Sequence, residues 1–333
     1  LQSNRKSTAG HLFGRNIIGF NNYLFVSAPY DGTVKANAGI VYGYRKTGNT
    51  WQVNTTIKPP LGGLYDDVFG TSLATDGEEL LAVGAYGHEP HGKVFVYKKL
   101  DEHWSIFELM QEITLPEFLT VYQFGDNLAI HGEWLAIPYI QNSPARIMLA
   151  IFKYDGQQWQ YHQVVEGGIT LSKSNTMAVA ISDDLMVIGG NILEINNEGF
   201  WEIRHILSPS DPEPMQMSSD FTHWITNGSL FGHSVAIHDN TIFIGAPLRD
   251  YGSTWDVGAV YVYVKDPDEP WSSRTETVKL VPRVKEEREL FGASISAFYN
   301  TVIIGAVGSD HNKNDTPRNK PGRAYIFQSE DYY

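Results

Sequence analysis

The residues whose types could do chemistry lie on a few polar loops of the sequence. The segment "HEPH" places His88, Glu89 and His91 close together. Two histidines beside a carboxylate can bind a transition metal. However, Pro90 interrupts the spacing and no regular helix positions the side chains, so we expect no metal at this segment.

A second segment, "DHNKND", alternates Asp310, Asn312 and Asn314 like the opening of a calcium loop. Asp315 stands where the glycine after the third ligand is expected, and the twelfth position is Pro321 rather than the closing Glu. We therefore expect a solvated loop and no cofactor, with these three residues as the weak candidates for a metal site.

Motifs of the common catalytic mechanisms are missing from the sequence. There is no Gly-x-Ser-x-Gly elbow, no Walker loop and no His-Glu-x-x-His segment. The acidic pairs Asp66–Asp67 and Asp183–Asp184 fall in predicted turns, where solvation would explain them. The absence of cysteine excludes disulfides, thiolate catalysis and zinc–thiolate sites. We expect a noncatalytic protein, and the alternative is a polysaccharide hydrolase with carboxylates drawn from distant loops.

The charge and hydrophobicity of the chain limit the kinds of partner that it is expected to bind. The formal net charge of −13 opposes nonspecific binding to nucleic acid, and no apolar run is long enough to span a membrane. Aromatic residues make up 13% and charged residues only 19%, which is typical of a globular chain with a large core. The partners that remain are a protein or a glycan.

The elements that must position these loops come from a repeat of about 55 residues. Copies begin with Phe-Gly near residues 13, 69, 124, 231 and 291, as in "FGRNIIGFNNYLFVSAP" and "FGHSVAIHDNTIFIGAP". A degenerate sixth copy, "NTMAVAISDDLMVIGG", begins near residue 176. Each copy continues into an alternating strand such as "GAVYVY", and several then carry a Trp: Trp51, Trp104, Trp159 and Trp271.

Alternation of apolar and polar residues between turns predicts four short antiparallel strands per copy and no helix. Units of this size are typical of propeller blades, so the sequence predicts an all-β, six-bladed propeller in a single domain spanning 1–333. The last copy stops after its third strand, and we expect the strand at Leu1 to close the ring beside residues 324–327.

Phe-Gly, an alternating strand, Gly-Ala-Pro, "GAVYVY" and Trp together resemble the FG-GAP repeat family of the integrin α-chain head. That resemblance implies a β-propeller at the cell surface or outside the cell that serves adhesion or recognition. The integrin-like members carry an Asp-rich calcium loop in the first hairpin of a blade. Here those hairpins are short, as in "GFNNY" and "IHDNT", so we expect no calcium in them.

Binding residues are expected on the long loops after each second strand and on the insertion between residues 208 and 229, because a rigid scaffold tolerates variation in such loops. Tyr139 and several further aromatic residues are predicted on this rim. Large aromatics beside an Arg are the composition of interface hot spots. The predicted ligand-binding residues are Tyr30, Tyr86, Phe221, His223, Trp224, Arg249, Asp250, Tyr251, Trp255 and Asp256.

Three interpretations stay open for the whole chain. It is a recognition module for a glycan or protein, a hydrolase that acts on a polysaccharide, or a structural piece of a larger surface assembly. The aromatics of the rim could equally be buried by the insertion folding over them. Sequons at Asn54, Asn227 and Asn314 matter only if the chain is secreted by a eukaryote.

Overall fold

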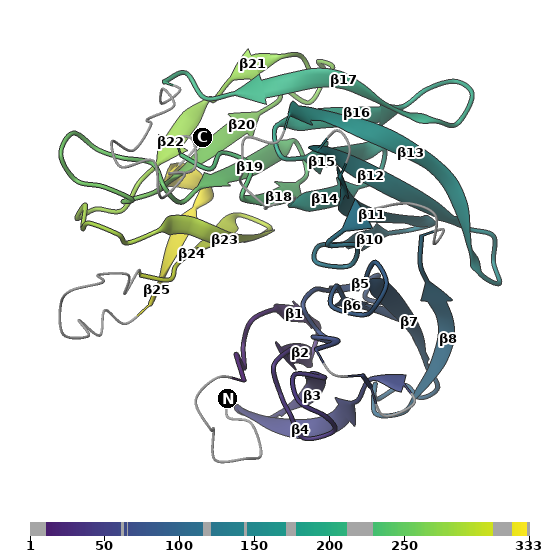
Figure 1. Cartoon of the computed structure of the whole chain (residues 1–333). Coiled ribbons are helices and arrows are strands. Elements are labelled where there is room, and N and C mark those ends of the chain that lie inside the picture. Colours follow the sequence, from purple (N-terminus) through teal and green to yellow (C-terminus); the bar gives the residue numbers. More distant parts are fainter. Residues whose placement is uncertain are drawn as a thin grey trace. The chain divides into compact units, whose positions relative to one another are not determined.

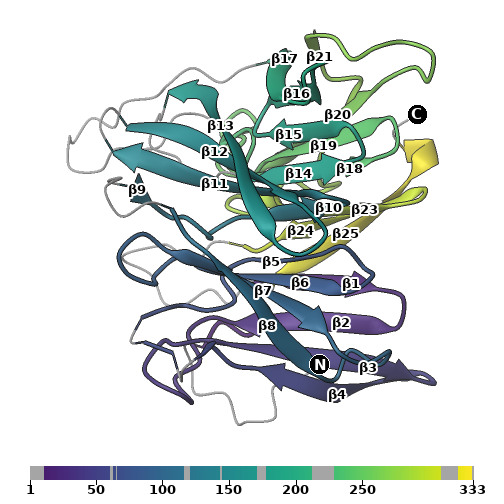
Figure 2. The same cartoon turned by 90° about the vertical axis from the view of Figure 1, so that its right-hand side faces the viewer.

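Six antiparallel sheets account for the described part of the chain (Figures 1 and 2). This computed structural model describes residues 11–60, 63–64, 66–115, 121–142, 145–170, 178–211, 229–308 and 322–331. Helical structure within those ranges is limited to a 3-10 turn at Ser329–Asp331 and a single 3-10 residue at Pro60. The chain divides into two compact units, unit 1 at Leu1–Glu166 and unit 2 at Gly167–Tyr333, and each is described by itself.

Unit 1 contains blades 1 to 3, each built around four antiparallel strands in chain order. Blade 3 has a short additional strand, β9, which pairs with β11. Blade 1 comprises β1 (Ile17–Phe20), β2 (Tyr23–Ala28), β3 (Ile40–Thr47) and β4 (Thr50–Ile57). Blade 2 comprises β5 (Leu73–Thr75), β6 (Leu80–Ala85), β7 (Lys93–Lys99) and β8 (Phe107–Ile113). Blade 3 comprises β9 (Val121–Tyr122), β10 (Ala129–His131), β11 (Trp134–Asn142), β12 (Ala145–Tyr154) and β13 (Trp159–Thr170), the last of which runs across the unit boundary.

Unit 2 contains blades 4 to 6. Blade 4 comprises β14 (Val179–Ser182), β15 (Leu185–Ile188), β16 (Asn191–Ile195) and β17 (Trp201–Ser208), with β21 (Arg274–Thr275) added in parallel to β17. Blade 5 comprises β18 (Ser234–His238), β19 (Thr241–Ala246), β20 (Ala259–Val264) and β22 (Val278–Leu280). Blade 6 comprises β23 (Phe291–Phe298), β24 (Thr301–Ala306) and β25 (Arg323–Gln328).

The all-β, six-bladed propeller fold predicted from the repeat is therefore confirmed. The short first hairpins are also confirmed: two residues lie between Phe20 and Tyr23 and between His238 and Thr241, and four lie between Thr75 and Leu80. The predicted closing strand at Leu1 lies outside the described residues, as does anything that pairs with the free edge of β25.

The repeated glycines allow neighbouring blades to approach closely. In blade 2, a Cβ atom on Gly84 would overlap the carbonyl oxygen of Gly125 in blade 3. Gly245 of blade 5 has the same relation to Gly292 of blade 6. Ser72 and Ser234 reinforce these contacts, since each hydroxyl donates to the same carbonyl at 2.7 Å. Only glycine fits where backbone meets backbone at this distance.

The phenylalanine of each Phe-Gly pair fills the core between blades. Phe69, Phe124 and Phe291 are fully buried. Phe69 packs among Phe25, Val41 and Ile57 of the preceding blade, as expected for a ring placed between two sheets. Aromatic rings of the third strand pack edge-on against these phenylalanines, with centroids 5.1 Å apart for Phe291 and Tyr325. The residues that recur in each copy of the repeat thus form the core, whereas the loops vary in sequence from blade to blade.

Candidate functional site

The loops after the second strands of blades 1, 2 and 5 share one backbone frame. In each loop, the N–H of one residue donates to the carbonyl of the alanine three residues earlier. The carbonyl of that same residue accepts the N–H of the glycine that ends the loop. We name this the anchor position. Its occupants are Asp31 in blade 1, His88 in blade 2 and Arg249 in blade 5; the glycine bonds measure 3.0, 2.6 and 2.9 Å from Gly39, Gly92 and Gly258.

The anchor in blade 1 is a buried carboxylate. Asp31 is 2% exposed and accepts hydrogen bonds from the Tyr42 hydroxyl at 3.1 Å and from both the N–H and the hydroxyl of Thr33. His11 Nδ1 lies 3.5 Å away. Burial alone would raise the pKa of Asp31, but these hydrogen bonds and His11 outweigh it and hold the pKa below its ordinary value.

The anchor in blade 2 is a histidine that meets a carboxylate from the segment between blades. His88 Nδ1 lies 2.9 Å from Asp67 Oδ1, and their side chains are 17% and 3% exposed. Asp67 also accepts the N–H of Leu64. The expectation that solvation explains Asp67 is therefore wrong, because the loop folds onto this carboxylate and excludes water from it.

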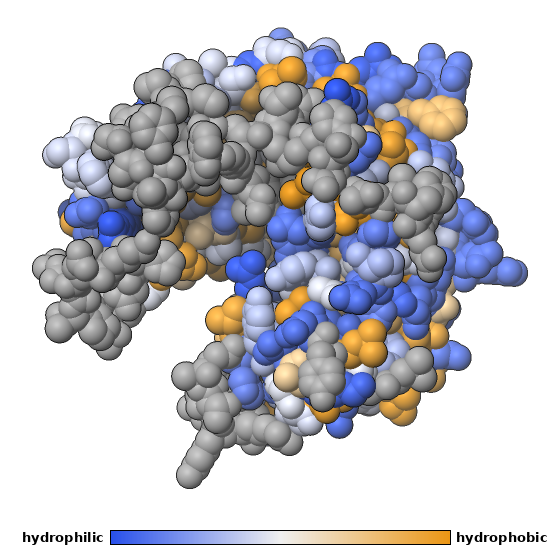
Figure 3. Space-filling view, in the orientation of Figure 1, coloured by the Kyte–Doolittle hydropathy of each residue, from blue (hydrophilic) through white to orange (hydrophobic). Residues whose placement is uncertain are grey.

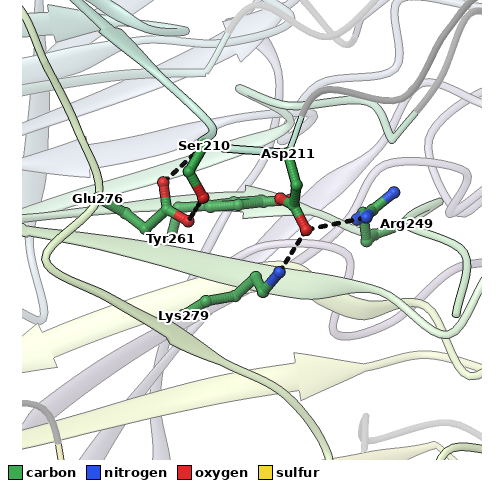
Figure 4. Close-up of polar contacts among 6 residues, drawn as sticks. All are labelled: Ser210, Asp211, Arg249, Tyr261, Glu276 and Lys279. Atoms are coloured by element: carbon green, nitrogen blue, oxygen red, sulfur yellow. Dashed lines mark hydrogen bonds and ion pairs between the residues drawn. The ribbon is translucent and has the colours of Figure 1, made fainter.

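The anchor in blade 5 is an arginine with an acidic partner in the segment before the blade (Figure 4). Asp211 Oδ2 accepts from Arg249 at 3.0 Å and from Lys279 at 2.5 Å, and its Oδ1 accepts the Tyr261 hydroxyl at 3.2 Å. Burial alone would raise the pKa of Asp211, but the two cations outweigh it and lower the pKa. At neutral pH this carboxylate is ionised.

The segment that carries Asp211 is fixed to blade 5 by further hydrogen bonds. Ser210 donates to the carboxylate of Glu276 through its N–H at 2.8 Å and its hydroxyl at 2.6 Å, as Figure 4 shows. The Tyr263 hydroxyl donates to the carbonyl of Ser208 at 2.9 Å. The position of Asp211 is thus determined by several contacts with one blade.

Three cations surround the ring of Tyr251. The Arg249 guanidinium lies 5.7 Å from the ring centroid, and the ammonium groups of Lys279 and Lys285 lie 5.8 and 5.2 Å from it. Each is within the range of a cation–π contact. We name Tyr251, these three cations, Asp211 and Trp255 the blade-five rim.

Trp255 stands out from this rim into solvent. The residue is 60% exposed. The peptide group that follows Trp255 makes two hydrogen bonds: its carbonyl accepts the Arg288 N–H at 2.8 Å, and its N–H, that of Asp256, donates to Asp250 Oδ1 at 2.8 Å. Tyr251 and Thr254 exchange two backbone hydrogen bonds just before it.

The structure brings together five of the predicted binding residues. Arg249, Asp250, Tyr251, Trp255 and Asp256 lie in one loop and contact one another directly or through adjacent backbone. The predicted partners Phe221, His223 and Trp224 from the insertion lie outside the described residues. The weak metal candidates Asp310, Asn312 and Asn314 also lie outside them.

Tyr30 and Tyr86 belong to unit 1 and contact each other. The hydroxyl groups are hydrogen-bonded, and this bond, with burial and the nearby Asp126, raises the pKa of Tyr86 to about 12. Both rings are half-buried, so they connect the loops of blades 1 and 2. Tyr139 was expected on the rim and is not there. It lies inside β11, is 4% exposed and pairs with Met148, because the second strand of blade 3 runs on through Asn142.

Among the residues suggested as metal ligands, one is paired with a carboxylate of the protein. His88 is paired with Asp67, and a search of the described ranges finds no group of three or more His, Asp or Glu side chains arranged to hold a metal. Asn54, the one sequon within those ranges, donates its side-chain amide to the carbonyls of His103 at 2.7 Å and Trp104 at 3.0 Å.

Sequence reasoning missed Asp211, Lys279, Lys285 and Tyr261. Tyr261 was read only as part of a core strand. One signal could have located Lys279: it faces Tyr261 across the sheet, where blade 1 has Thr56 and blade 2 has Glu112. The residue at this paired position is a lysine in blade 5, a threonine in blade 1 and a glutamate in blade 2. Such a change in charge indicates a position that varies between blades.

Hydrophobic residues do not form one large patch on the face drawn in Figure 3, where small orange groups alternate with blue. Within the described ranges, no helix is long and apolar enough to cross a membrane.

Comparison with known proteins supports the identity of the repeat. The model of the FG-GAP repeat matches residues 226–263 and 274–327, which cover blades 5 and 6 and all of the blade-five rim except Asp211. No curated protein matches the chain. Among solved structures, the periplasmic gluconolactonase PpgL of Pseudomonas aeruginosa is similar at 11% identity with a TM-score of 0.38, over 82% of this chain and 85% of that one.

FG-GAP repeats are typical of extracellular or cell-surface proteins. The Phe-Gly and Gly-Ala-Pro segments form the contacts between blades, the blades repeat six times, and the family model matches two of them. The chain is thus a β-propeller that carries FG-GAP repeats at residues 226–263 and 274–327.

Proposed function

We propose that this chain is a noncatalytic recognition module that acts outside the cell or at its surface and binds a ligand through the blade-five rim. The observation that carries the proposal is Trp255: a large aromatic residue, 60% exposed, followed by a peptide group that makes two hydrogen bonds. Exposing such a ring to water is unfavourable, and holding it rigid reduces the entropy lost when a ligand covers it.

The surroundings of Trp255 fit recognition better than catalysis. The cations of the rim are engaged with Asp211 or with the ring of Tyr251, and these contacts create no nucleophile beside a base. Tryptophan, tyrosine and arginine in one small area are the residues that dominate binding energy at interfaces. Among the residues that the structure describes, no particular group of side chains supports the hydrolase alternative.

The test is a binding screen with Trp255→Ala as the diagnostic variant. The labelled protein is applied to a glycan array and to a panel of secreted and surface proteins, and affinity is measured for each hit. Loss of a hot-spot tryptophan costs about 2 kcal/mol or more, so we expect affinity to fall at least about 30-fold with an unchanged melting temperature.

Trp51→Ala is the matched control, since Trp51 is also exposed, at 36%, but lies on β4 of unit 1. It should bind like the wild type. A wild type that binds nothing on either panel contradicts the proposal, and so does a hit whose affinity is the same in the Trp255→Ala variant.

A further inference from the structure

The blade-five rim concentrates positive charge in a protein whose formal net charge is −13. Arg249, Lys279 and Lys285 all lie within 6 Å of the centroid of one tyrosine ring. Like charges this close repel one another, and the cost is tolerated only where something compensates it. The question is how much of this charge the protein itself neutralises.

Asp211 compensates only part of it. This carboxylate is shared by Arg249 and Lys279, and its side chain is 38% exposed. Lys285 is exposed, and in the described part of the chain it contacts the ring of Tyr251 but forms no ion pair with a carboxylate. The nearby carboxylates Glu286 and Glu289 are engaged by Arg323, at 2.9 and 3.1 Å. Of the three cations, Lys285 is therefore the one that stays exposed without a carboxylate partner among the described residues, in the same rim as Trp255.

The backbone of the rim is not available for pairing with a peptide strand. Tyr251 and Thr254 bond each other, the Trp255 carbonyl accepts from Arg288, and the Asp256 N–H donates to Asp250. A peptide that adds to a sheet needs free main-chain groups. Recognition here must come from side chains, namely one exposed indole face and several cations. An indole face stacks well on the C–H face of a sugar ring, and cations pair with anionic groups on it.

We propose that the blade-five rim binds an anionic glycan, a chain bearing uronate or sulfate groups, with its sugar ring on Trp255 and its anionic group between Lys279 and Lys285. This inference rests on the proposed function and specifies its ligand class. Bound anionic groups relieve the repulsion among the three cations. Binding should therefore weaken with salt, because the Debye length falls from about 10 Å at 0.1 M to about 3 Å at 1 M.

The test uses four commercial polymers: polygalacturonate for uronate, dextran sulfate for sulfate, neutral dextran and polyglutamate. Affinity of the full chain for each is measured at low and high salt by biolayer interferometry. We expect binding to at least one of the two anionic polysaccharides, little binding to dextran, and weaker binding to polyglutamate. Affinity for the anionic polysaccharide should fall in Trp255→Ala.

Two charge variants make the test specific to the rim. Lys285→Gln removes an exposed cation and should lower the affinity about tenfold without changing the melting temperature. Asp211→Asn removes the shared carboxylate and should raise the affinity severalfold, which a purely structural role would not do. Lys46→Gln, an exposed lysine on β3 of unit 1, is the matched control and should bind like the wild type.

The outcomes separate the two proposals. Binding that depends on Trp255 but is equally strong for neutral dextran, or is insensitive to Lys285→Gln, overturns the anionic ligand and leaves the recognition site standing. Polyglutamate bound as tightly as the polysaccharides, independently of Trp255, overturns the glycan. No binding to either anionic polysaccharide at low salt also overturns this inference, while the wider screen still decides the proposed function.

Discussion

Blades 2 and 5 hold the same loop position with different chemistry. In blade 2, His88 is paired with one carboxylate, Asp67, which is buried, and His88 itself is 17% exposed. In blade 5, Arg249 meets Asp211, which is shared with Lys279 and is more than a third exposed. The first pair joins one histidine to one carboxylate, with little exposure to solvent. The second leaves surplus positive charge at the surface, and this difference separates a loop that serves stability from a loop suited to binding.

The largest effect is expected where the loops of blades 1 and 5 share their backbone conformation, at the glycine that ends each loop. Gly39 and Gly258 have φ of +86° and +89°, and a Cβ atom at either would overlap a carbonyl oxygen, of Phe69 or Phe291. Alanine at either position should lower the free energy of unfolding by about 3 kcal/mol or more, measured by urea denaturation.

Gly252→Ala is the control for that pair. Gly252 also has a positive φ, +61°, but no atom lies within 4 Å of its Cβ direction. It should lose only about 1 to 2 kcal/mol from backbone strain. If Gly39→Ala and Gly258→Ala cost no more than this control, the loops do not depend on the close approach to the next blade.

The next prediction sharpens the contrast between the two carboxylates. Asp67→Ala leaves the part-buried His88 ring and the N–H of Leu64 without their hydrogen-bond partner, so the free energy of unfolding should fall by about 2 to 3 kcal/mol. Asp211→Ala should cost about 1 kcal/mol or less, because solvent screens an exposed pair. Equal losses, measured in the same denaturation series, would remove the distinction between a structural and an open anchor.

A third prediction concerns Asp126 in unit 1, whose pKa is raised by burial, with Arg15 opposing the shift. A carboxyl with a raised folded pKa binds its proton more tightly when folded, so its charge destabilises the fold once the pH exceeds that pKa. Asp126→Asn should therefore raise the melting temperature at pH 7. A gain of about 1 kcal/mol would correspond to about 2 to 4 °C.

The advantage of Asp126→Asn should shrink as the pH falls toward 4, because the wild-type carboxyl then becomes protonated. Asp31→Asn should behave in the opposite sense. Its lowered pKa contributes stability above the ordinary value of about 3.9, and that contribution is lost as the pH falls through the folded value. Melting curves from pH 3.5 to 7 check both signs, and a variant that follows the other's trend contradicts the assignment.

The smallest expected effect is at the pair Tyr30 and Tyr86. Tyr30→Phe removes the hydrogen bond that contributes most to raising the pKa of Tyr86 to about 12. The pKa of Tyr86 should fall toward its ordinary value, as followed by ultraviolet difference titration, while stability changes by about 1 kcal/mol or less. A titration curve unchanged from that of the wild type would show that the two rings do not interact.

The fold was predictable because each copy of the repeat places apolar and small residues at the same positions, where neighbouring blades pack. Phe69 and Gly84 read as core and close approach from their place in the pattern, and the structure places them so. Tyr139 was misplaced because the repeat fades in blade 3, where β11 extends through Asn142. The rim was predictable in part: the aromatic and charged loop was evident, but its partners were not.

By itself, the sequence determined the all-β class, the number of blades and the loops free to vary, since these follow from local alternation and from spacing along the chain. Only the tertiary structure decided which charges meet. Asp211 lies 38 residues from Arg249 and 68 from Lys279, so no local pattern connects them. Their pairing arises because an inter-blade segment folds across the end of a blade, and the surplus charge of the blade-five rim follows from that contact.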